Sequence, residues 1–261
     1  MAAAATLSPL YRGPARSGLA DLDELRYREE IEPYPDPVAA VVAMIEDKEL
    51  PRKLEYVLAR ADVRPAGTVV DLGAGTCWLA GTLAVRPEVE RVIAVEFSAR
   101  RLTELAPIAL AHVRAPAEKV ERRVADFYQH GLGDGFADLV TMDAAFHHAA
   151  DPTHLARVAY DLLRPGGQVL LFREPTLSLL RRSRPHGEED MHGSFEHEYH
   201  AGEYLGFLRA VGFKARKSRA SGGFATPRAR ALLKPPLSWL SGILFSEYSY
   251  VGWKPDRVAP A

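Results

Sequence analysis

The sequence predicts an α/β protein in which a mostly parallel sheet carries helices on both faces. Between residues 67 and 172, short apolar runs alternate with stretches of helical period. The runs are short enough to be strands buried on both faces. Strands that alternate with helices form parallel sheets through right-handed crossovers. The chain has 261 residues, 47% of them hydrophobic, so it can bury a full core without disulfides.

The first 61 residues divide into an arm and a helical region. Residues 1–20 contain small residues, Gly and Pro without a sustained period, and we expect a mobile arm there. A helical pattern follows, which the prolines of 33–37 interrupt. Val38–Ile45 and Leu50–Leu58 are predicted helices, because apolar residues recur at helical spacing in both.

Four apolar runs are the predicted central strands: Thr68–Leu72, Arg91–Glu96, Asp138–Asp143 and Gly167–Phe172. Three helical stretches lie between them: Leu79–Val85, Ala99–Ala111 and His154–Leu163. Right-handed crossovers place the carboxyl ends of all these strands on one edge of the sheet. Ligands of α/β proteins bind at that edge.

After Pro175 the regular alternation stops. Residues 176–192 are polar and Arg-rich, a helix is predicted for Ala201–Val211, and Phe213–Ser218 and Phe245–Trp253 favour strands. We therefore expect an N-terminal arm and helical lid over 1–49. The main domain then covers 50–261, with an insertion around 176–200 that forms a lid over the acceptor.

Charge and cysteine content exclude several classes of protein. Lys and Arg number 33 against 34 Asp and Glu, a net charge of −1, which removes the bulk electrostatic argument for a nucleic-acid or membrane partner. Lys214–Arg219 is a candidate for a local basic patch, but we interpret it as a solvated strand. Cys77 is the only cysteine, and Met1–Leu10 lacks the features of a signal peptide. We expect a cytoplasmic protein.

A glycine turn follows the first predicted strand. Gly73 and Gly75 come directly after Val69-Val70-Asp71-Leu72 and lead into a helix, which is the setting of a nucleotide-binding turn. Glycine permits a positive φ and lets a ligand approach the main chain closely. Asp71 precedes the turn, where a carboxylate favours a cationic ligand or anchors the loop.

Two cofactors compete for this turn. A dinucleotide site requires a third glycine for close packing of helix on strand, and Trp78 stands at that position. S-adenosylmethionine has no pyrophosphate, so its site tolerates the tryptophan. Glu96 ends the second strand 25 positions after Asp71, where an acid accepts hydrogen bonds from ribose hydroxyls. The turn and the spaced acid together favour S-adenosylmethionine.

With these motifs, residues 50–213 resemble the class I S-adenosylmethionine-dependent methyltransferases. The segments that carry the resemblance are Asp71–Thr76, Val95–Ser98, Ala125–Phe127, Asp138–Ala144 and Leu163–Gly167. The resemblance implies an enzyme with a Rossmann-like, seven-stranded, mostly parallel sheet, to which the N-terminal helices add a cap. Glu247–Trp253 is then the antiparallel strand that closes the family sheet.

The resemblance also implies roles for residues. The glycine turn wraps the methionine part of the cofactor, Glu96 binds the ribose, Asp126 bonds the adenine amino group, and Phe127 lies beside the ring. The complete set expected to contact the cofactor is Asp71, Gly73, Ala74, Gly75, Thr76, Glu96, Phe97, Asp126, Phe127, Asp143 and Ala144. Read alone, Asp126 also suits a helix cap, and Trp78 suits packing as well as stacking. Cys77 is interpreted as a packing residue.

Histidines mark the acceptor side. His147 and His148 follow the predicted strand Asp138–Asp143, and an imidazole is a suitable general base if the acceptor is a hydroxyl. The same pair also suits an ordinary loop of this family. His197, Tyr199 and His200 are expected to contact the acceptor. A metal held by His197 and His200 is the alternative, but no closed ligand set accompanies them, and we expect no metal.

The predicted activity is methyl transfer to a small molecule, with a hydroxyl acceptor slightly favoured. Two alternatives stay open: a methyltransferase that acts on protein or RNA, and a non-catalytic protein that binds S-adenosylmethionine. The near-zero net charge argues against RNA. Residues 232–245 are either an apolar wall of the acceptor pocket or a core helix. Tyr27 or Tyr34 is expected to touch the cofactor if the N-terminal helices close over it.

Overall fold

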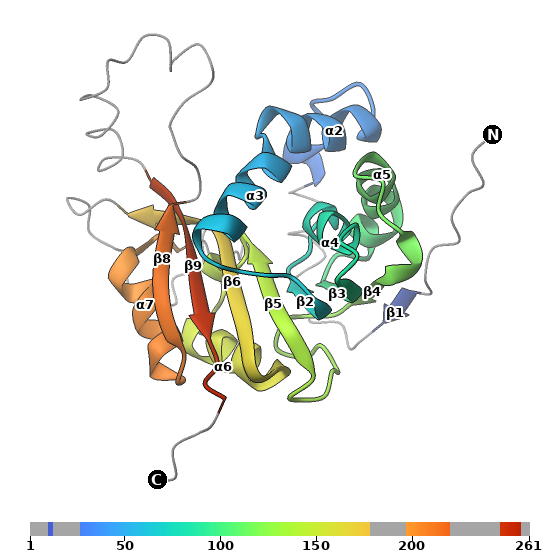
Figure 1. Ribbon diagram of the computed structural model, residues 1–261. Helices are drawn as coiled ribbons and strands as arrows, with labels where there is room; N and C mark the ends of the chain where they lie inside the picture. The colour runs from blue at the N-terminus through green and yellow to red at the C-terminus, as the bar shows by residue number, and fades with distance from the viewer. Residues whose placement is uncertain (1–9, 13–26, 178–196, 220–245, 257–261) are drawn as a thin grey trace.

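The computed structural model describes residues 10–12, 27–177, 197–219 and 246–256, and a central sheet runs through the middle of the molecule (Figure 1). The predicted strands in residues 67–172 are confirmed within a few residues. The described strands are β1 (Leu10–Arg12), β2 (Gly67–Leu72), β3 (Val89–Glu96), β4 (Val120–Val124), β5 (Ala137–Asp143), β6 (Leu163–Leu177), β7 (Tyr199–His200), β8 (Lys214–Arg219) and β9 (Ser246–Trp253).

The sheet is mostly parallel, as predicted. Its order is β1-β4-β3-β2-β5-β6-β9-β8, and β7 pairs with β6 away from this path. Within the described part of the chain only β9 runs antiparallel to its neighbours, β6 and β8. The order therefore reverses between β2 and β5, which is the switch point where α/β proteins bind ligands.

The predicted count of seven strands is wrong, because the sheet has nine among the described residues. Seven strands, in the order β4-β3-β2-β5-β6-β9-β8, form the expected sheet, and β1 and β7 are additions to it. β1 pairs in parallel with β4, and β7 pairs with the last two residues of β6. Both additions are two or three residues long. Main-chain hydrogen bonds along a free edge hold them, and such short segments carry no side-chain period.

β1 also corrects the expectation of a mobile arm over residues 1–20, since Leu10–Arg12 is a strand. The rest of that arm, most of the insertion around 176–200 and the apolar stretch 232–245 lie outside the described residues. β4 was not among the predicted strands, because its sequence Val-Glu-Arg-Arg-Val is charged. The guanidinium of Arg122 is nevertheless buried, where it donates to the carbonyl of Leu102.

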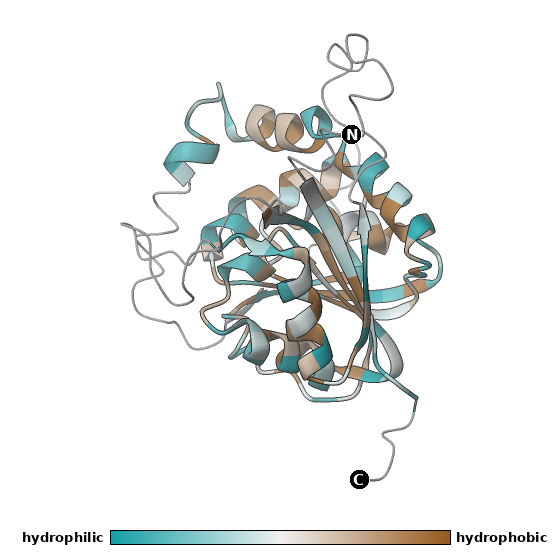
Figure 2. Cartoon of the chain, turned by 90° about the vertical axis from the view of Figure 1, so that its left-hand side faces the viewer, coloured by the Kyte–Doolittle hydropathy of each residue, from teal (hydrophilic) through white to brown (hydrophobic). Residues whose placement is uncertain are grey.

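Helices cover both faces of the sheet, as predicted, and form two cores. The helices of one face are α2 (Pro37–Asp47), α3 (Leu50–Arg60), α4 (Trp78–Ala84) and α5 (Ala106–His112), and those of the other are α6 (Pro152–Leu162) and α7 (Ala201–Ala210). Figure 2 shows the hydrophobic residues along the strands and on the helix sides that meet them.

An Asp-Pro pair begins both α2 and α6. Asp36 Oδ1 accepts from the N–H of Ala39 at 2.8 Å, and Asp151 Oδ1 accepts from that of His154 at 2.9 Å. Each aspartate caps the free N–H groups of the first turn, while the proline that follows has no N–H to satisfy. The caps fix where α6 begins, and therefore the length of the loop from β5 that carries His147.

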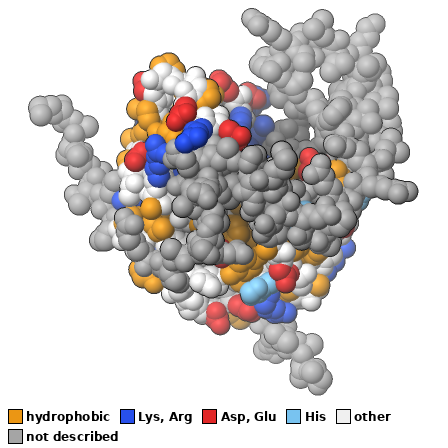
Figure 3. Space-filling model, turned by 180° about the vertical axis from the view of Figure 1, so that it is seen from behind, with side chains coloured by type: hydrophobic (Ala, Val, Ile, Leu, Met, Phe, Trp, Pro, Cys, Tyr) orange, Lys and Arg blue, Asp and Glu red, His pale blue; other side chains and the backbone are white. Residues whose placement is uncertain are grey.

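The described surface mixes charges of both signs. On the face that Figure 3 shows, acidic and basic side chains lie among hydrophobic ones, in keeping with the net charge of −1. In the described ranges, no helix combines the length and apolar character that a membrane crossing requires.

Candidate active site

The glycine turn joins β2 to α4 and has the backbone that the sequence predicted. Gly73 has φ 73° and Gly75 has φ 53°, both in the left-handed region. A Cβ on Gly73 would lie 2.7 Å from the Cβ of Ala145 and 3.4 Å from the ring of Phe127. The turn therefore needs glycine, and it lies where the loops after β4 and β5 converge on it.

Glu96 fastens the glycine turn to the end of β3. Its Oε2 accepts from the N–H of Gly75 at 2.9 Å, and its Oε1 accepts from the N–H of Ser98 at 3.0 Å. The carboxylate is buried. The structure thus brings together the turn and the acid that the sequence paired at a distance. Ribose binding by Glu96 stays a prediction.

Asp71 is a buried acid directly behind the turn, with 1% of its surface exposed. Its Oδ1 accepts from the hydroxyl of Thr141 at 2.7 Å, and its Oδ2 has no hydrogen-bond partner in the described structure. Burial raises the pKa of Asp71 to about 7, and the nearby carboxylates of Asp143 and Glu96 add to this, while the bond from Thr141 opposes it. A positively charged ligand beside this carboxyl would favour its ionised form.

Asp143, at the end of β5, is held by two side chains. Trp78 Nε1 donates to Asp143 Oδ2 at 2.7 Å, and Arg173 donates to both oxygens at 2.8 Å. Arg173 has φ 55° and lies where the register between β6 and β9 shifts, so the irregular backbone turns its side chain toward Asp143. Trp78 therefore has a structural role, as a hydrogen-bond donor to Asp143. Arg173 was not among the site residues predicted from the sequence.

His147 is oriented by a buried carboxylate that the sequence also missed. Glu174 Oε2 lies 2.8 Å from His147 Nδ1. The same side chain accepts from the N–H groups of Ala145, Phe146 and His147 at 3.0 to 3.2 Å. Glu174 follows Phe172, the last residue of the predicted strand, by two positions. The charged pair Arg173-Glu174 directly after the predicted strand is the sequence feature that could have indicated both residues as part of the site.

His148 lies beside His147, with ring centroids 4.0 Å apart. Both belong to a short 3-10 turn that the buried side chain of Phe146 anchors. The pair therefore stands at the carboxyl edge of β5, as the sequence predicted. Its catalytic role is a proposal, developed below.

The predicted acceptor residues are placed unevenly. The N–H of His197 donates to the carbonyl of His147 at 3.2 Å, so this segment does reach the histidine loop. Tyr199 is 1% exposed and packs edge-on against Tyr204 in the core. The N–H of His200 donates to Glu203 at the start of α7. His197 is also buried, at 4% exposed, whereas His200 is partly exposed. Contact of all three with the acceptor stays a prediction.

The predicted adenine side lies after β4. Asp126 Oδ1 accepts from the N–H of Tyr128 at 2.7 Å, which closes a tight turn, and Phe127 is partly exposed with its ring edge toward Gly73. Phe97 is also partly exposed. Of the remaining predicted contacts, Ala74 and Thr76 are buried within the turn, and Ala144 has φ 47°.

These residues fit S-adenosylmethionine. The glycines leave room at the turn, Asp71 offers an unpartnered oxygen, and the nearby acids suit a ligand that carries a cationic sulfur. Burial raises the pKa of the Cys77 thiol, so this cysteine is poorly suited to act as a nucleophile. No group of three possible metal ligands gathers among the residues that the structure describes.

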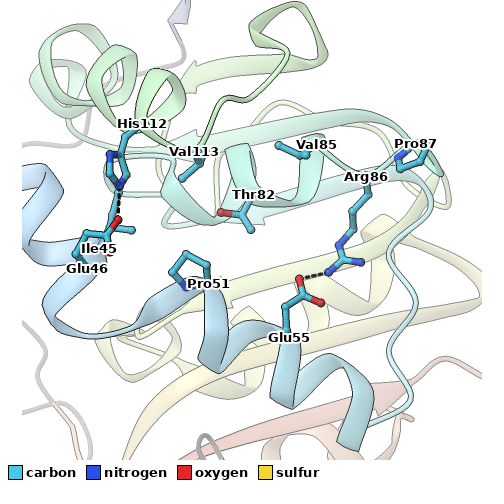
Figure 4. Close-up of a pocket in the computed structure, with 10 residues that line it drawn as sticks. All are labelled: Ile45, Glu46, Pro51, Glu55, Thr82, Val85, Arg86, Pro87, His112 and Val113. Carbon is cyan, nitrogen blue, oxygen red and sulfur yellow. Dashed lines mark hydrogen bonds and ion pairs between the residues drawn. The ribbon is translucent and has the colours of Figure 1, made fainter. Parts of the chain in front are cut away.

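A separate groove of about 500 Å³ lies on the helical side (Figure 4). It is bordered by α2, α3, the second half of α4 and the end of α5. His112 and Glu46 pair across it at 2.9 Å, and Arg86 pairs with Glu55. The glycine turn is at the other end of α4, so this groove is not part of the site.

One family model matches the middle of the chain. Residues 70–171 match the family model described as a methyltransferase domain, a segment that runs from β2 to β6 and contains the glycine turn, Glu96 and His147. Over these residues the chain matches a methyltransferase domain, which supports the class I S-adenosylmethionine-dependent family that the resemblance predicted. The predicted family is confirmed, and S-adenosylmethionine is the cofactor of its members.

Two curated proteins are similar to this chain in sequence. One is an uncharacterized 37.1 kDa protein of transposon Tn4556 from Streptomyces fradiae, 31% identical over 179 residues. The other is the ubiquinone biosynthesis O-methyltransferase of Xanthomonas axonopodis pv. citri (strain 306), 32% identical over 123 residues. The matches cover 66% and 46% of this chain and 47% and 48% of the relatives. The chain thus matches about half the length of each.

Solved structures share the fold of this chain. A methyltransferase in complex with the Trm112 activator of Haloferax volcanii gives a TM-score of 0.59 at 21% identity, over 81% of this chain and 92% of that one. An S-adenosylmethionine-dependent methyltransferase from Mesorhizobium loti gives 0.52 at 20% identity, over 76% and 97%. At such identities the likeness shows the fold alone.

Proposed function

We propose that this chain transfers the methyl group of S-adenosylmethionine to a hydroxyl of a small molecule, with His147 as the general base. The observation that carries the proposal is the His147–Glu174 pair, 2.8 Å apart, at the edge of the sheet that also holds the glycine turn. The loop of His147 contacts that turn directly, since Ala145 is the residue against which a Cβ on Gly73 would clash.

Glu174 fixes the tautomer of His147. Three main-chain N–H groups donate to this carboxylate, so its oxygens act as acceptors, and ring Nδ1 of His147 supplies the hydrogen of the fourth bond. The lone pair of the imidazole is then on Nε2, the nitrogen that points away from Glu174. Nε2 accepts the hydroxyl proton of the acceptor as that oxygen takes up the methyl group.

The acids near the turn suit the charge of the cofactor. When bound, S-adenosylmethionine supplies the methyl group from a positively charged sulfur. Asp71 and Glu96 lie behind and beside the turn, and Asp143 is neutralised in part by Arg173. In this proposal Glu96 binds the ribose, while Asp126 and Phe127 hold the adenine.

The acceptor class rests on two further observations. One relative is named as an O-methyltransferase of ubiquinone biosynthesis, which supports oxygen as the methylated atom. The net charge of −1 and the mixed charges of the described surface disfavour nucleic acid and membrane surfaces as partners. His148, His197, Tyr199 and His200 are proposed to shape the acceptor side, and the protein is proposed to act in the cytoplasm.

The test measures S-adenosylhomocysteine formed by the purified chain with a panel of phenols, catechols and aliphatic alcohols. We expect His147→Ala to lower kcat by about 100-fold or more with at least one acceptor. Glu174→Gln should also lower kcat, because the amide replaces one of the two acceptor oxygens by an NH2 group and no longer fixes the tautomer of His147. His112→Ala, at the distant groove, is the matched histidine control. Unchanged kcat in His147→Ala would reject the histidine as base.

A further inference from the structure

A continuous series of contacts links the glycine turn to the N-terminal segment. Glu96 accepts from Gly75 on one oxygen and from Ser98 on the other. The hydroxyl of Ser98 accepts from the N–H of Arg101 at 2.9 Å. The guanidinium Nη2 of Arg101 then donates to Glu30 at 2.7 Å. Gly75 and Glu30, which are far apart in the sequence, are thus linked through Glu96, Ser98 and Arg101.

Arg101 stands over the turn itself. A Cβ on Gly75 would have one neighbour within 4 Å, the Nη1 of Arg101 at 3.8 Å. The side chain of Arg101 is 12% exposed. It begins a π-helical turn, Arg101–Leu105, and such turns occur frequently at functional sites. Nη1 therefore faces the glycine turn, while Nη2 donates to Glu30.

The charges around the turn indicate what Arg101 could bind. The acids there, Asp71, Glu96 and Asp143, suit the cationic sulfur, the amine and the ribose of the cofactor, but the cofactor also carries a carboxylate. Arg173 already donates to both carboxylate oxygens of Asp143. A guanidinium is well suited to a carboxylate because its N–H groups form a planar fork.

We propose that Arg101 binds the α-carboxylate of S-adenosylmethionine and that Glu30 is the positioning residue that aims its guanidinium. The proposal rests on the proposed function, since it assigns a subsite of the same cofactor. It makes the N-terminal segment a part of the cofactor site, in place of a cover that merely closes over it.

Contacts next to Glu30 hold that segment in place. The ring of Tyr27 lies 3.1 Å from the guanidinium carbon of Arg100, and Ile31 is buried in the core of this face. Tyr34 is exposed. The N-terminal region thus contacts Arg100 through Tyr27 and Arg101 through the carboxylate of Glu30.

The experiment compares two ligands by isothermal calorimetry with the full chain. S-adenosylmethionine carries the carboxylate, and its decarboxylated form keeps the amine, the sulfonium and the adenosine. We expect Arg101→Gln to weaken binding of S-adenosylmethionine by about 10- to 100-fold and to leave the decarboxylated form unchanged. Arg101→Lys, which keeps the charge and loses the fork, should fall between. Arg52→Gln, at an exposed arginine of α3 that also pairs with a glutamate, Glu49 at 2.9 Å, is the matched control.

Glu30→Gln extends the test to a side chain that is 44% exposed, where a substitution does not threaten the fold. We expect it to weaken S-adenosylmethionine by roughly fivefold and the decarboxylated form not at all. Equal losses for both ligands in Arg101→Gln and in Glu30→Gln would overturn the carboxylate subsite alone. An unsubstituted chain that binds neither ligand would overturn the proposed function and this subsite together.

Discussion

Replacing Asp71 with asparagine is expected to remove a pH dependence of stability that the buried carboxyl imposes. The pKa of Asp71 is raised from 3.8 to about 7, chiefly by burial. The folded chain therefore holds this proton more tightly than the unfolded chain does. The stabilisation is fully present below pH 3.8 and is lost as the pH rises to about 7, above which both states are ionised. Asparagine carries no such proton.

The magnitude follows from the size of the shift. Each pKa unit corresponds to about 1.4 kcal/mol, so the full effect is about 4 kcal/mol, and about 3 kcal/mol of it falls between pH 5 and pH 8. The amide oxygen of Asp71→Asn still accepts from Thr141, so the neighbouring packing is retained. We expect the free energy of unfolding of the unsubstituted chain to fall relative to that of the variant over this range.

The assay is urea unfolding at four pH values from 5 to 8, with both proteins measured in the same buffers. Thr141→Val provides the opposite perturbation. It removes the hydrogen bond that favours the ionised form, so the loss of stability should extend to higher pH. Parallel curves for the unsubstituted chain and Asp71→Asn would show that the carboxyl ionises near its ordinary pKa, and would refute the reasoning.

Three further outcomes follow from the site. Gly73→Ala should lower stability by about 1–3 kcal/mol and abolish cofactor binding, because φ is positive and the added Cβ would lie 2.7 Å from the Cβ of Ala145. Thermal unfolding and calorimetry measure the two effects. Gly202→Ala, in an open position of α7, should be neutral or stabilising in the same thermal unfolding experiment. Arg173→Gln should cost about 3 kcal/mol by leaving Asp143 without its ion pair, and a double-mutant cycle with Asp143→Asn should recover part of that cost. The thiol of Cys77, which is buried and has a raised pKa, should react with a thiol reagent at the rate of unfolding; fast labelling of the folded chain would contradict its burial.

The central fold was predictable because its signals are local. Apolar runs of strand length and helical spacing mark the elements from β2 to β6, and the glycines and the acid Glu96 mark the turn. Glycine is required wherever φ is positive next to a close neighbour, and both conditions are met at Gly73. The family resemblance rested on the same residues, and the family comparison matched the same stretch.

The strands that were not predicted, β1, β4 and β7, are all stabilised by contacts with other parts of the chain. β1 and β7 are short strands held by main-chain bonds to an existing sheet. β4 is charged in sequence and yet buries Arg122 against a carbonyl from another element. Periodicity reports only the side chains of the segment itself, so it does not detect a segment whose partner supplies the hydrogen bonds.

By itself, the sequence determined the type of protein, the place of the glycine turn and the acids and histidines at the edge of the sheet. The tertiary structure decided which of them act together. Glu174 reaches His147 across 27 positions, and Glu30 reaches Arg101 across 71. Such pairs depend on the register of neighbouring strands and on how one helix packs on another. Those are long-range properties, and no local spacing of residues encodes them.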